Sequence, residues 1–225
     1  MSMIVYGAPL SPFVRKVRLF LAEKGLDYDL EMILPFGKQP DWYKDLNPLG
    51  RIPAFKDGDF SLADSSVICQ YIEEQYPDCT PLLGNNAEQR ARVRWLEKYA
   101  DYEIAPLSTF CVFRNRVLKT SMGKASDETA IAQTMNEKLP PHFDYLEEQL
   151  GDKQFFVGDA LTLADLAITC QWVNMQHGDE RIDASRWPKL AAHCSRIYSL
   201  GSLQAVLAAE HAMLAKMASK VAQPS

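Results

Sequence analysis

A serine followed by a proline, at a predicted strand-to-helix turn, is the first feature of this sequence that could do chemistry. Ser11–Pro12 follows an apolar stretch at 3–6 and opens a helical pattern that runs to Lys24. Serine is favoured at a helix N-cap and proline at the first helical position. The N–H groups at a helix start also favour an anion, to which a serine hydroxyl can donate. Capping alone explains the motif, and an anion site is the chemical alternative.

Two later segments carry the same mixture of structural and chemical signals. Pro53 opens a predicted strand in R-I-P-A-F, where it marks an edge or a cis turn that would present the backbone of Ile52 to a peptide ligand. Asp64 and Ser65 stand at a predicted helix start. They can cap that helix, or hold an anion at the serine and an amine at the carboxylate.

Other polar residues are assigned to structure. Thr162 and Asp165 resemble a capping box, and Leu161 with Leu166 fits the hydrophobic staple around it. The five cysteines and four histidines are scattered without zinc-type spacing, which predicts no metal site and reduced thiols. The basic run Arg15–Arg18 is predicted to be a solvated helix face.

The elements that would position these motifs change character near residue 80. In the first part, strand and helix signals alternate. Strands are predicted at 3–6, 28–32, 52–55 and 60–62, and helices at 12–24, 41–46 and 64–75. After a linker at 77–86, helices alone are predicted, at 87–119, 127–150, 163–176, 187–200 and 203–218. Pro140–Pro141 must kink or split the second of these helices. The sequence therefore predicts a small α/β domain at 1–78 and an all-helical domain at 87–225.

Composition narrows the class of protein. A hydrophobic content of 47% in 225 residues supports a real core. The net charge of −5 argues against a nucleic-acid-binding protein. No apolar run is long enough to span a membrane, and the N-terminal residues do not resemble a signal peptide. These features predict a cytoplasmic protein.

The order and spacing of the motifs together resemble the cytosolic glutathione transferase family. The matching runs are Y-G-A-P-L-S-P-F-V-R-K-V-R, N-P-L-G-R-I-P-A-F, L-A-D-S-S-V-I-C-Q-Y-I and F-F-V-G-D-A-L-T-L-A-D-L-A. They span nearly the whole chain and are most similar to serine-type members, either bacterial or of the theta, phi or tau kind. The resemblance implies an α+β/α fold class: a thioredoxin-like N-terminal domain with a mixed four-stranded sheet, then an all-helical C-terminal domain.

The resemblance also implies a role for each motif in binding glutathione, the co-substrate. Ser11 matches the serine whose hydroxyl donates to the glutathione sulfur and stabilises the thiolate. Ile52 matches the residue whose backbone pairs with the cysteinyl part, and Pro53 matches the cis-proline after it. Asp64 and Ser65 match the pair that holds the γ-glutamyl group.

The glycyl end of glutathione and the identity of the activating residue are the variable parts. Lys38 matches a basic residue near the glycyl carboxylate, and Arg51 matches a polar position beside the same pocket. Gly37 stands where many relatives place a histidine. Tyr6 is the alternative activating residue, since other classes use a tyrosine in the first strand. We expect Ser11 to be the activating residue and Tyr6 to face the core or a neighbouring strand.

The electrophile would lie against the helical domain. Tyr102, Phe110, Phe113 and Arg114 are the candidate lining residues, and core packing explains the aromatic ones equally well. Asp101 matches an acidic position that approaches the neighbouring subunit's glutathione in some classes. The resemblance therefore also implies a homodimer.

Two function classes follow from these observations. The first is a glutathione transferase that conjugates glutathione to small hydrophobic electrophiles, with hydroperoxide reduction as a variant of the same thiolate chemistry. The second is a non-catalytic regulatory or binding member of the fold, resembling the stringent-starvation proteins. The joint presence of Ser11, Pro53, Asp64 and Ser65 favours the enzyme, because a binding protein has no need of the complete set.

Overall fold

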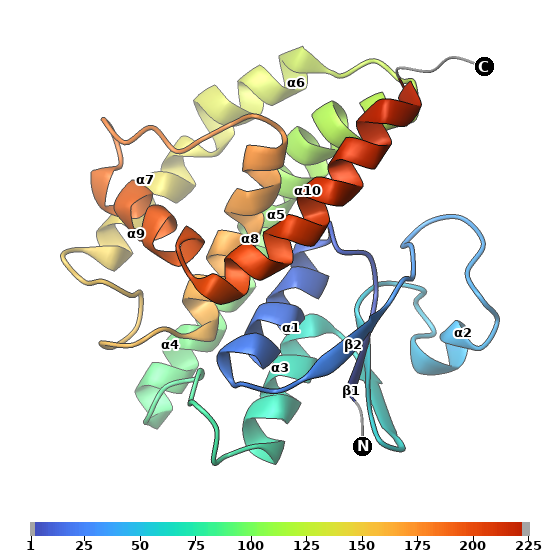
Figure 1. Cartoon of the computed structure of the whole chain (residues 1–225). Helices are drawn as coiled ribbons and strands as arrows, with labels where there is room; N and C mark the ends of the chain where they lie inside the picture. Colours follow the sequence, from blue (N-terminus) through green and yellow to red (C-terminus); the bar gives the residue numbers. More distant parts are fainter. Residues whose placement is uncertain (1–2, 222–225) are drawn as a thin grey trace.

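The computed structural model describes residues 3–221, and the first part of this range folds around a four-stranded sheet (Figure 1). Its strands are β1 (Met3–Tyr6), β2 (Tyr28–Glu31), β3 (Ala54–Asp57) and β4 (Phe60–Ala63), in the spatial order β2-β1-β3-β4. β2 runs parallel to β1, whereas β3 runs antiparallel to both β1 and β4. The sheet is therefore mixed, as predicted.

Alternating side chains of β1 face two different apolar clusters, because successive residues of a strand point to opposite faces. Met3 and Val5 belong to the main core, which contains the buried residues of α1 (Pro12–Glu23) and α3 (Ser65–Gln75). Tyr6 belongs to a smaller cluster with residues that include Tyr43 of α2 (Tyr43–Leu46). Helices thus cover both faces of the sheet, with α2 on the side away from α1 and α3 (Figure 1).

The remainder of the described chain is helical. A continuous long helix spans residues 87–119 and contains α4 (Ala87–Tyr99), η1 (Ala100–Ile104), α5 (Ala105–Leu107) and η2 (Ser108–Lys119), where η marks wider, π-helical turns. It is followed by α6 (Glu128–Gln133), η3 (Thr134–Lys138), α7 (Pro140–Leu150), α8 (Leu163–His177), α9 (Pro188–Tyr198) and α10 (Gly201–Val221). Helical structure is interrupted at Leu139, directly before the proline pair, as predicted. Between residues 3 and 221 we find no helix that combines the length and the apolar character of a membrane span.

Helix α8 lies at the centre of the helical part. Every residue from Leu163 to Met175 is buried. The predicted capping box at its start is confirmed, since Asp165 Oδ2 accepts from the Thr162 backbone N–H at 2.9 Å and from its hydroxyl at 2.8 Å. The other oxygen of Asp165 lies 2.8 Å from His193 Nε2.

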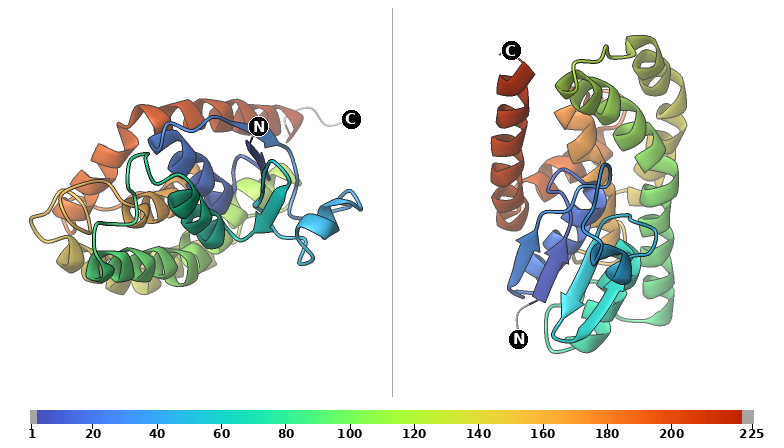
Figure 2. Two further views of the ribbon diagram at one scale, coloured as in Figure 1. Left: turned by 90° about the horizontal axis from the view of Figure 1, so that it is seen from below. Right: turned by 90° about the vertical axis from the view of Figure 1, so that its right-hand side faces the viewer.

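One hydrophobic core joins the sheet and the helical part. The same cluster of buried side chains extends from Val5 of β1 through Val14 of α1 and Trp172 of α8 to Leu203 of α10. Figure 2 shows α1 lying between α10 on one side and the long helix on the other. The first helix of the α/β domain is therefore embedded in the helical domain, and every residue from Val14 to Leu21 is buried.

The basic run on α1 is accordingly not a solvated helix face, and that prediction was wrong. Arg15 is 0% exposed and Lys16 is 1% exposed. The signal was present in the sequence, because Val14, Val17 and the three apolar residues at 19–21 leave α1 no polar side. What could not be seen was which distant acids would pair with the two cations.

Candidate functional site

The strand register brings three loops to one end of the sheet. Tyr6, at the end of β1, pairs with Ala54 at the start of β3, which pairs in turn with Ala63 at the end of β4. These three paired residues lie side by side at one end of the sheet. The segments attached to them there, namely the β1–α1 turn, the segment before β3 and the β4–α3 turn, therefore lie next to one another. Gly7 permits a close approach there, since a Cβ at this position would lie 2.4 Å from the Val14 side chain.

Ser11 caps α1 and retains a hydrogen-bond donor. Its Oγ accepts from the backbone N–H of Val14 at 3.4 Å, a bond that uses a lone pair and leaves the hydroxyl proton available. Among the residues that the structure describes, no acceptor binds that proton. The first turn of α1 carries no acidic side chain, so the positive end of its dipole is not offset from within the helix. An anion at this turn would meet both favourable groups.

Asp64 and Ser65 form the start of α3. Asp64 Oδ1 accepts from the backbone N–H groups of Ser66 at 2.9 Å and Val67 at 3.2 Å. Asp64 is exposed, and its second carboxylate oxygen, which makes no hydrogen bond among the described residues, can accept from a cationic amine. Asp64 also adopts φ 77°, which is a strained conformation for a residue other than glycine, and such strain is often found at binding sites. Ser65 is buried beside it.

The Arg51 carbonyl, in the segment before β3, is held by two side chains. The Ile52–Pro53 peptide bond is cis. The Arg51 carbonyl accepts from Tyr43 Oη and from Asn47 Nδ2, both at 2.8 Å. These two bonds fix the backbone directly before Ile52, and the sequence analysis did not identify either donor. The sequence offers only residue types as a signal, namely a tyrosine within the helix predicted at 41–46 and an asparagine directly after it.

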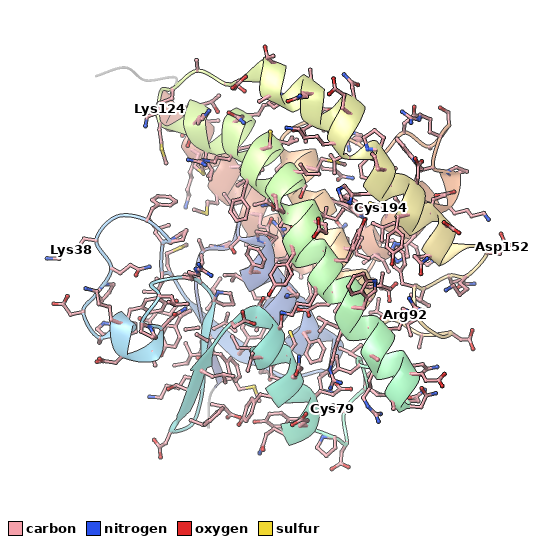
Figure 3. The ribbon with its side chains drawn as sticks, turned by 180° about the vertical axis from the view of Figure 1, so that it is seen from behind. Lys38, Cys79, Arg92, Lys124, Asp152 and Cys194 are labelled. Atoms are coloured by element: carbon pink, nitrogen blue, oxygen red, sulfur yellow. The ribbon has the colours of Figure 1, made fainter. Side chains whose placement is uncertain are left out.

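The two basic candidates are both exposed, and the structure does not bring Lys38 to the other site residues. Figure 3 shows Lys38 at the outer edge of the loop between β2 and α2, with its side chain pointing away from the sheet. This loop encloses a hollow of about 460 Å³ lined by residues 32–34 and 36–40. The Gln39 side chain holds the loop by donating to the carbonyls of Leu34 and Gly50 at 2.7 and 2.8 Å.

Tyr6, the alternative activating residue, points to the opposite face of the sheet from α1. It is 6% exposed, and its ring packs edge-on against Trp42 and Tyr43 at centroid distances of 5.6 and 6.4 Å. Burial raises its pKa. This agrees with the expectation that Tyr6 faces a core cluster.

The long helix carries an exposed stripe of candidate residues, one of which contacts α1 near its start. Tyr102, Phe110 and Arg114 are all exposed, with Tyr102 at 66% and Phe110 at 54%. The Phe110 ring stacks on Phe13, two residues beyond Ser11, at a centroid distance of 6.4 Å. Phe113 lies elsewhere: it is 3% exposed and packs toward His177 in the core.

Asp101 points inward, to the buried Lys16. Lys16 Nζ lies 2.6 Å from Asp101 Oδ2 and 2.6 Å from Glu97 Oε1. Glu97 accepts in turn from the hydroxyl of Ser66, in the first turn of α3, at 2.5 Å. This cluster ties α1, α3 and the long helix together directly behind the proposed γ-glutamyl position. Across residues 3–221, no group of three His, Cys, Asp or Glu side chains is arranged as a metal site would require.

Comparisons with known proteins agree with this arrangement. The sequence matches the family models described as glutathione S-transferase, N-terminal domain, over residues 5–82 and glutathione S-transferase, C-terminal domain, over residues 113–210. A glutathione S-transferase of Hyoscyamus muticus is 36% identical over 173 residues, which cover 74% of this chain and 79% of that protein. Glutathione S-transferase 3 of Zea mays is 36% identical over 165 residues, or 72% of each chain.

Solved structures of the same kind share the whole architecture. A glutathione S-transferase from Rhodospirillum rubrum superposes with a TM-score of 0.82 at 28% identity and covers 91% of both chains. A thioredoxin-like domain with a four-stranded sheet, followed by a helical domain, is thus common to the chain and these structures. The chain belongs to the glutathione S-transferase family.

Proposed function

We propose that the protein is a glutathione transferase in which the Ser11 hydroxyl stabilises the thiolate of bound glutathione. One observation carries the assignment to Ser11: its Oγ accepts from Val14 N–H, so the hydroxyl proton is left to donate to an anion. The positive end of α1 favours the same charge. Tyr6 is the weaker candidate, because its ring is packed between the sheet and α2.

The other parts of glutathione bind to the three loops at the end of the sheet. The Ile52 backbone, beside Pro53, pairs with the cysteinyl part of the tripeptide. The γ-glutamyl amine binds the second carboxylate oxygen of Asp64, and the γ-glutamyl carboxylate binds at Ser65, the first residue of α3, where the helix dipole is positive. Arg51 is exposed near the glycyl carboxylate, whereas Lys38 must swing inward with its loop to contribute.

The reaction needs no general base from the protein. A free thiol has a pKa of about 8.5, and a hydrogen-bond donor at a helix N-terminus lowers it into the neutral range. The thiol proton leaves to solvent when glutathione binds. The thiolate sulfur then forms a bond to an electrophilic carbon of the substrate. In a substitution the leaving group departs from that carbon with the bonding electrons. In an addition the displaced electron pair moves to a neighbouring atom, which takes up a proton from solvent. Hydroperoxide reduction is a further reaction open to the same thiolate.

The electrophile binds along the exposed stripe of the long helix. Phe110 is anchored by Phe13 beside the start of α1, which places an apolar surface next to the sulfur. Tyr102 and Arg114 extend this surface in both directions along the helix. Phe113 belongs to the core in this proposal and does not line the site. An apolar stripe with one cation suits small hydrophobic electrophiles that carry polar groups.

The domain limits, assembly and location complete the proposal. The glutathione-binding domain comprises residues 1–78 and the helical domain residues 87–225, and the stretch between α3 and α4 contains no helix or strand. We propose a cytoplasmic homodimer. Exposed apolar side chains on β4, α3 and the long helix support a partner surface there, namely Phe60, Val67 and Trp95.

The test is the ultraviolet absorbance of the glutathione thiolate across a pH series, with wild type and Ser11→Ala. We expect the bound thiol to titrate well below the free-thiol range, and the Ser11→Ala variant to shift this titration upward. Absence of any thiolate signal from the wild type, although binding is demonstrated by calorimetry, would refute catalysis and favour a non-catalytic binding protein. A wild-type signal that Ser11→Ala leaves unchanged would reassign activation to Tyr6 or the backbone.

A further inference from the structure

A chain of side-chain contacts connects the C-terminal helix to the turn that carries Ser11. Glu210 of α10 binds Arg15 through both of its oxygens, at 2.8 Å from Nε and 2.5 Å from Nη2. Arg15 Nη1 donates to Asn174 Oδ1 of α8 at 2.9 Å. Asn174 Nδ2 then donates to the carbonyl of Leu10 at 3.3 Å. Leu10 directly precedes Ser11 in the chain.

Every member of this chain is buried. Glu210, Arg15 and Asn174 are each 0% exposed, and Leu10 is 5% exposed. Away from water, polar groups that satisfy one another in this way are held rigidly, because any displacement leaves a buried donor or acceptor without a partner.

Asparagine is well suited to the central position. Its carbonyl oxygen accepts from a cation on one side, while its NH₂ group donates to a backbone carbonyl on the other. Aspartate, when ionised, lacks the donor, and an aliphatic residue lacks both groups. Arg15 already has the Glu210 carboxylate and the Cys170 carbonyl, at 2.8 Å, as acceptors. The Arg15 charge is therefore compensated without Asn174. What the contact between Asn174 and Leu10 adds is a fixed position for the turn before Ser11.

Fixing the Leu10 carbonyl fixes the plane of the Leu10–Ser11 peptide, because the six atoms of a peptide unit are coplanar. The Ser11 N–H at the other end of this plane donates to the Ala8 carbonyl at 3.0 Å. The Ser11 carbonyl, on the other side of Cα, accepts from the Arg15 backbone N–H at 2.9 Å. With the peptide planes on both sides of Cα held, the direction of the Ser11 Cβ is set before any ligand arrives. We propose that Asn174, held by Arg15 and Glu210, is a positioning residue that aims the Ser11 hydroxyl at the sulfur of bound glutathione. This inference rests on the function proposed for Ser11.

The test compares Asn174→Leu, which keeps the branching of the side chain and adds no charge, with a matched variant. Val173→Ala removes a buried side chain from the same turn of α8, and Val173 makes no hydrogen bond to Leu10 through its side chain. The titration of bound glutathione is followed by thiolate absorbance in wild type, both variants, Ser11→Ala and the double variant Ser11→Ala/Asn174→Leu. Asn174→Ala serves in the same series if the leucine variant does not fold.

We expect Asn174→Leu to raise the pKa of the bound thiol by about half a unit, a roughly threefold loss in its ionisation constant. Val173→Ala should leave that pKa unchanged even if it lowers the thermal stability. Because Asn174 acts through Ser11, the double variant should titrate like Ser11→Ala alone.

Two results overturn the inference while leaving the proposed function intact. In the first, the wild type forms a thiolate and Asn174→Leu titrates as the wild type does. In the second, the Asn174→Leu shift persists in full on the Ser11→Ala background, so that Asn174 acts by another route. A wild type that forms no thiolate refutes the proposed function itself and this inference with it, and the wild-type curve alone identifies that case.

Discussion

Removal of the Glu210 carboxylate should strongly destabilise the fold, because it leaves the buried Arg15 cation without a counter-charge. In Glu210→Ala the guanidinium loses two charge-assisted hydrogen bonds, and the carboxylate bond to His177 Nε2, at 2.8 Å, is lost as well. Breaking a buried ion pair in this way costs about 3–5 kcal/mol. For a chain of this size each kcal/mol lowers Tm by about 2–4 °C, which gives a fall of roughly 6–20 °C.

The assay is urea denaturation followed by circular dichroism, with two reference variants. Glu128→Ala breaks an ion pair with Arg116 in which Glu128 is 59% exposed, and it should cost less than about 1 kcal/mol. The double variant Arg15→Met/Glu210→Leu removes both buried charges and should recover much of the lost stability. If Glu210→Ala is no more destabilising than Glu128→Ala, the reasoning about an uncompensated buried cation is refuted.

Three further predictions concern catalysis, ligand binding and pH. Ser11→Ala should lower turnover by about one to two decades, because a hydrogen bond to a charged group contributes roughly 1.5–3 kcal/mol. Steady-state kinetics measure this change, and an unchanged rate would contradict the role of the hydroxyl. Asp64→Asn should weaken glutathione binding in calorimetry while the circular dichroism spectrum stays unchanged, since the amide oxygen still caps α3; equal affinity would contradict an amine contact at this carboxylate. Burial alone would raise the pKa of Glu210, but the charges and hydrogen bonds of Arg15 and His177 outweigh burial and lower that pKa below its ordinary value of 4.5. Burial also lowers the pKa of His177 below its ordinary value of 6.5. Both groups then bind protons more readily in the unfolded chain, so the free energy of unfolding should decline as pH falls below about 6.5 and further below about 4.5. A urea series across pH tests this, and Glu210→Gln should flatten the lower part of the curve.

The parts of the fold and site that sequence predicted are those with local causes. Each cap, at Ser11, Asp64 and Thr162, is formed with residues only a few positions away in the sequence. The strand at 3–6 and the break before Pro140 likewise depend on neighbouring residues. Boundaries moved by only a few residues: the third strand, for instance, was predicted at 52–55 and is formed by Ala54–Asp57.

The parts that sequence did not predict depend on residues far apart in the chain. Lys16 meets its acids more than 80 positions away, at Glu97 and Asp101, and Arg15 meets Glu210 at a separation of 195 residues. No local pattern reports such pairs. The orientation of Phe110 and Phe113 was equally hidden, because π-helical turns in η2 alter the angular spacing that an α-helical pattern assumes.

The single core that α1 shares with α8 makes the two domains one cooperative unit. Domains with separate cores can unfold one after the other, whereas here the release of either would expose apolar faces of both. Amides of α1 and α8 should therefore exchange with deuterium in one concerted, slowest event. A protease cut in the stretch between α3 and α4 should yield two fragments that remain associated until global denaturation. In evolutionary terms, neither half could be exchanged for that of a distant relative without co-selection of the residues that line α1.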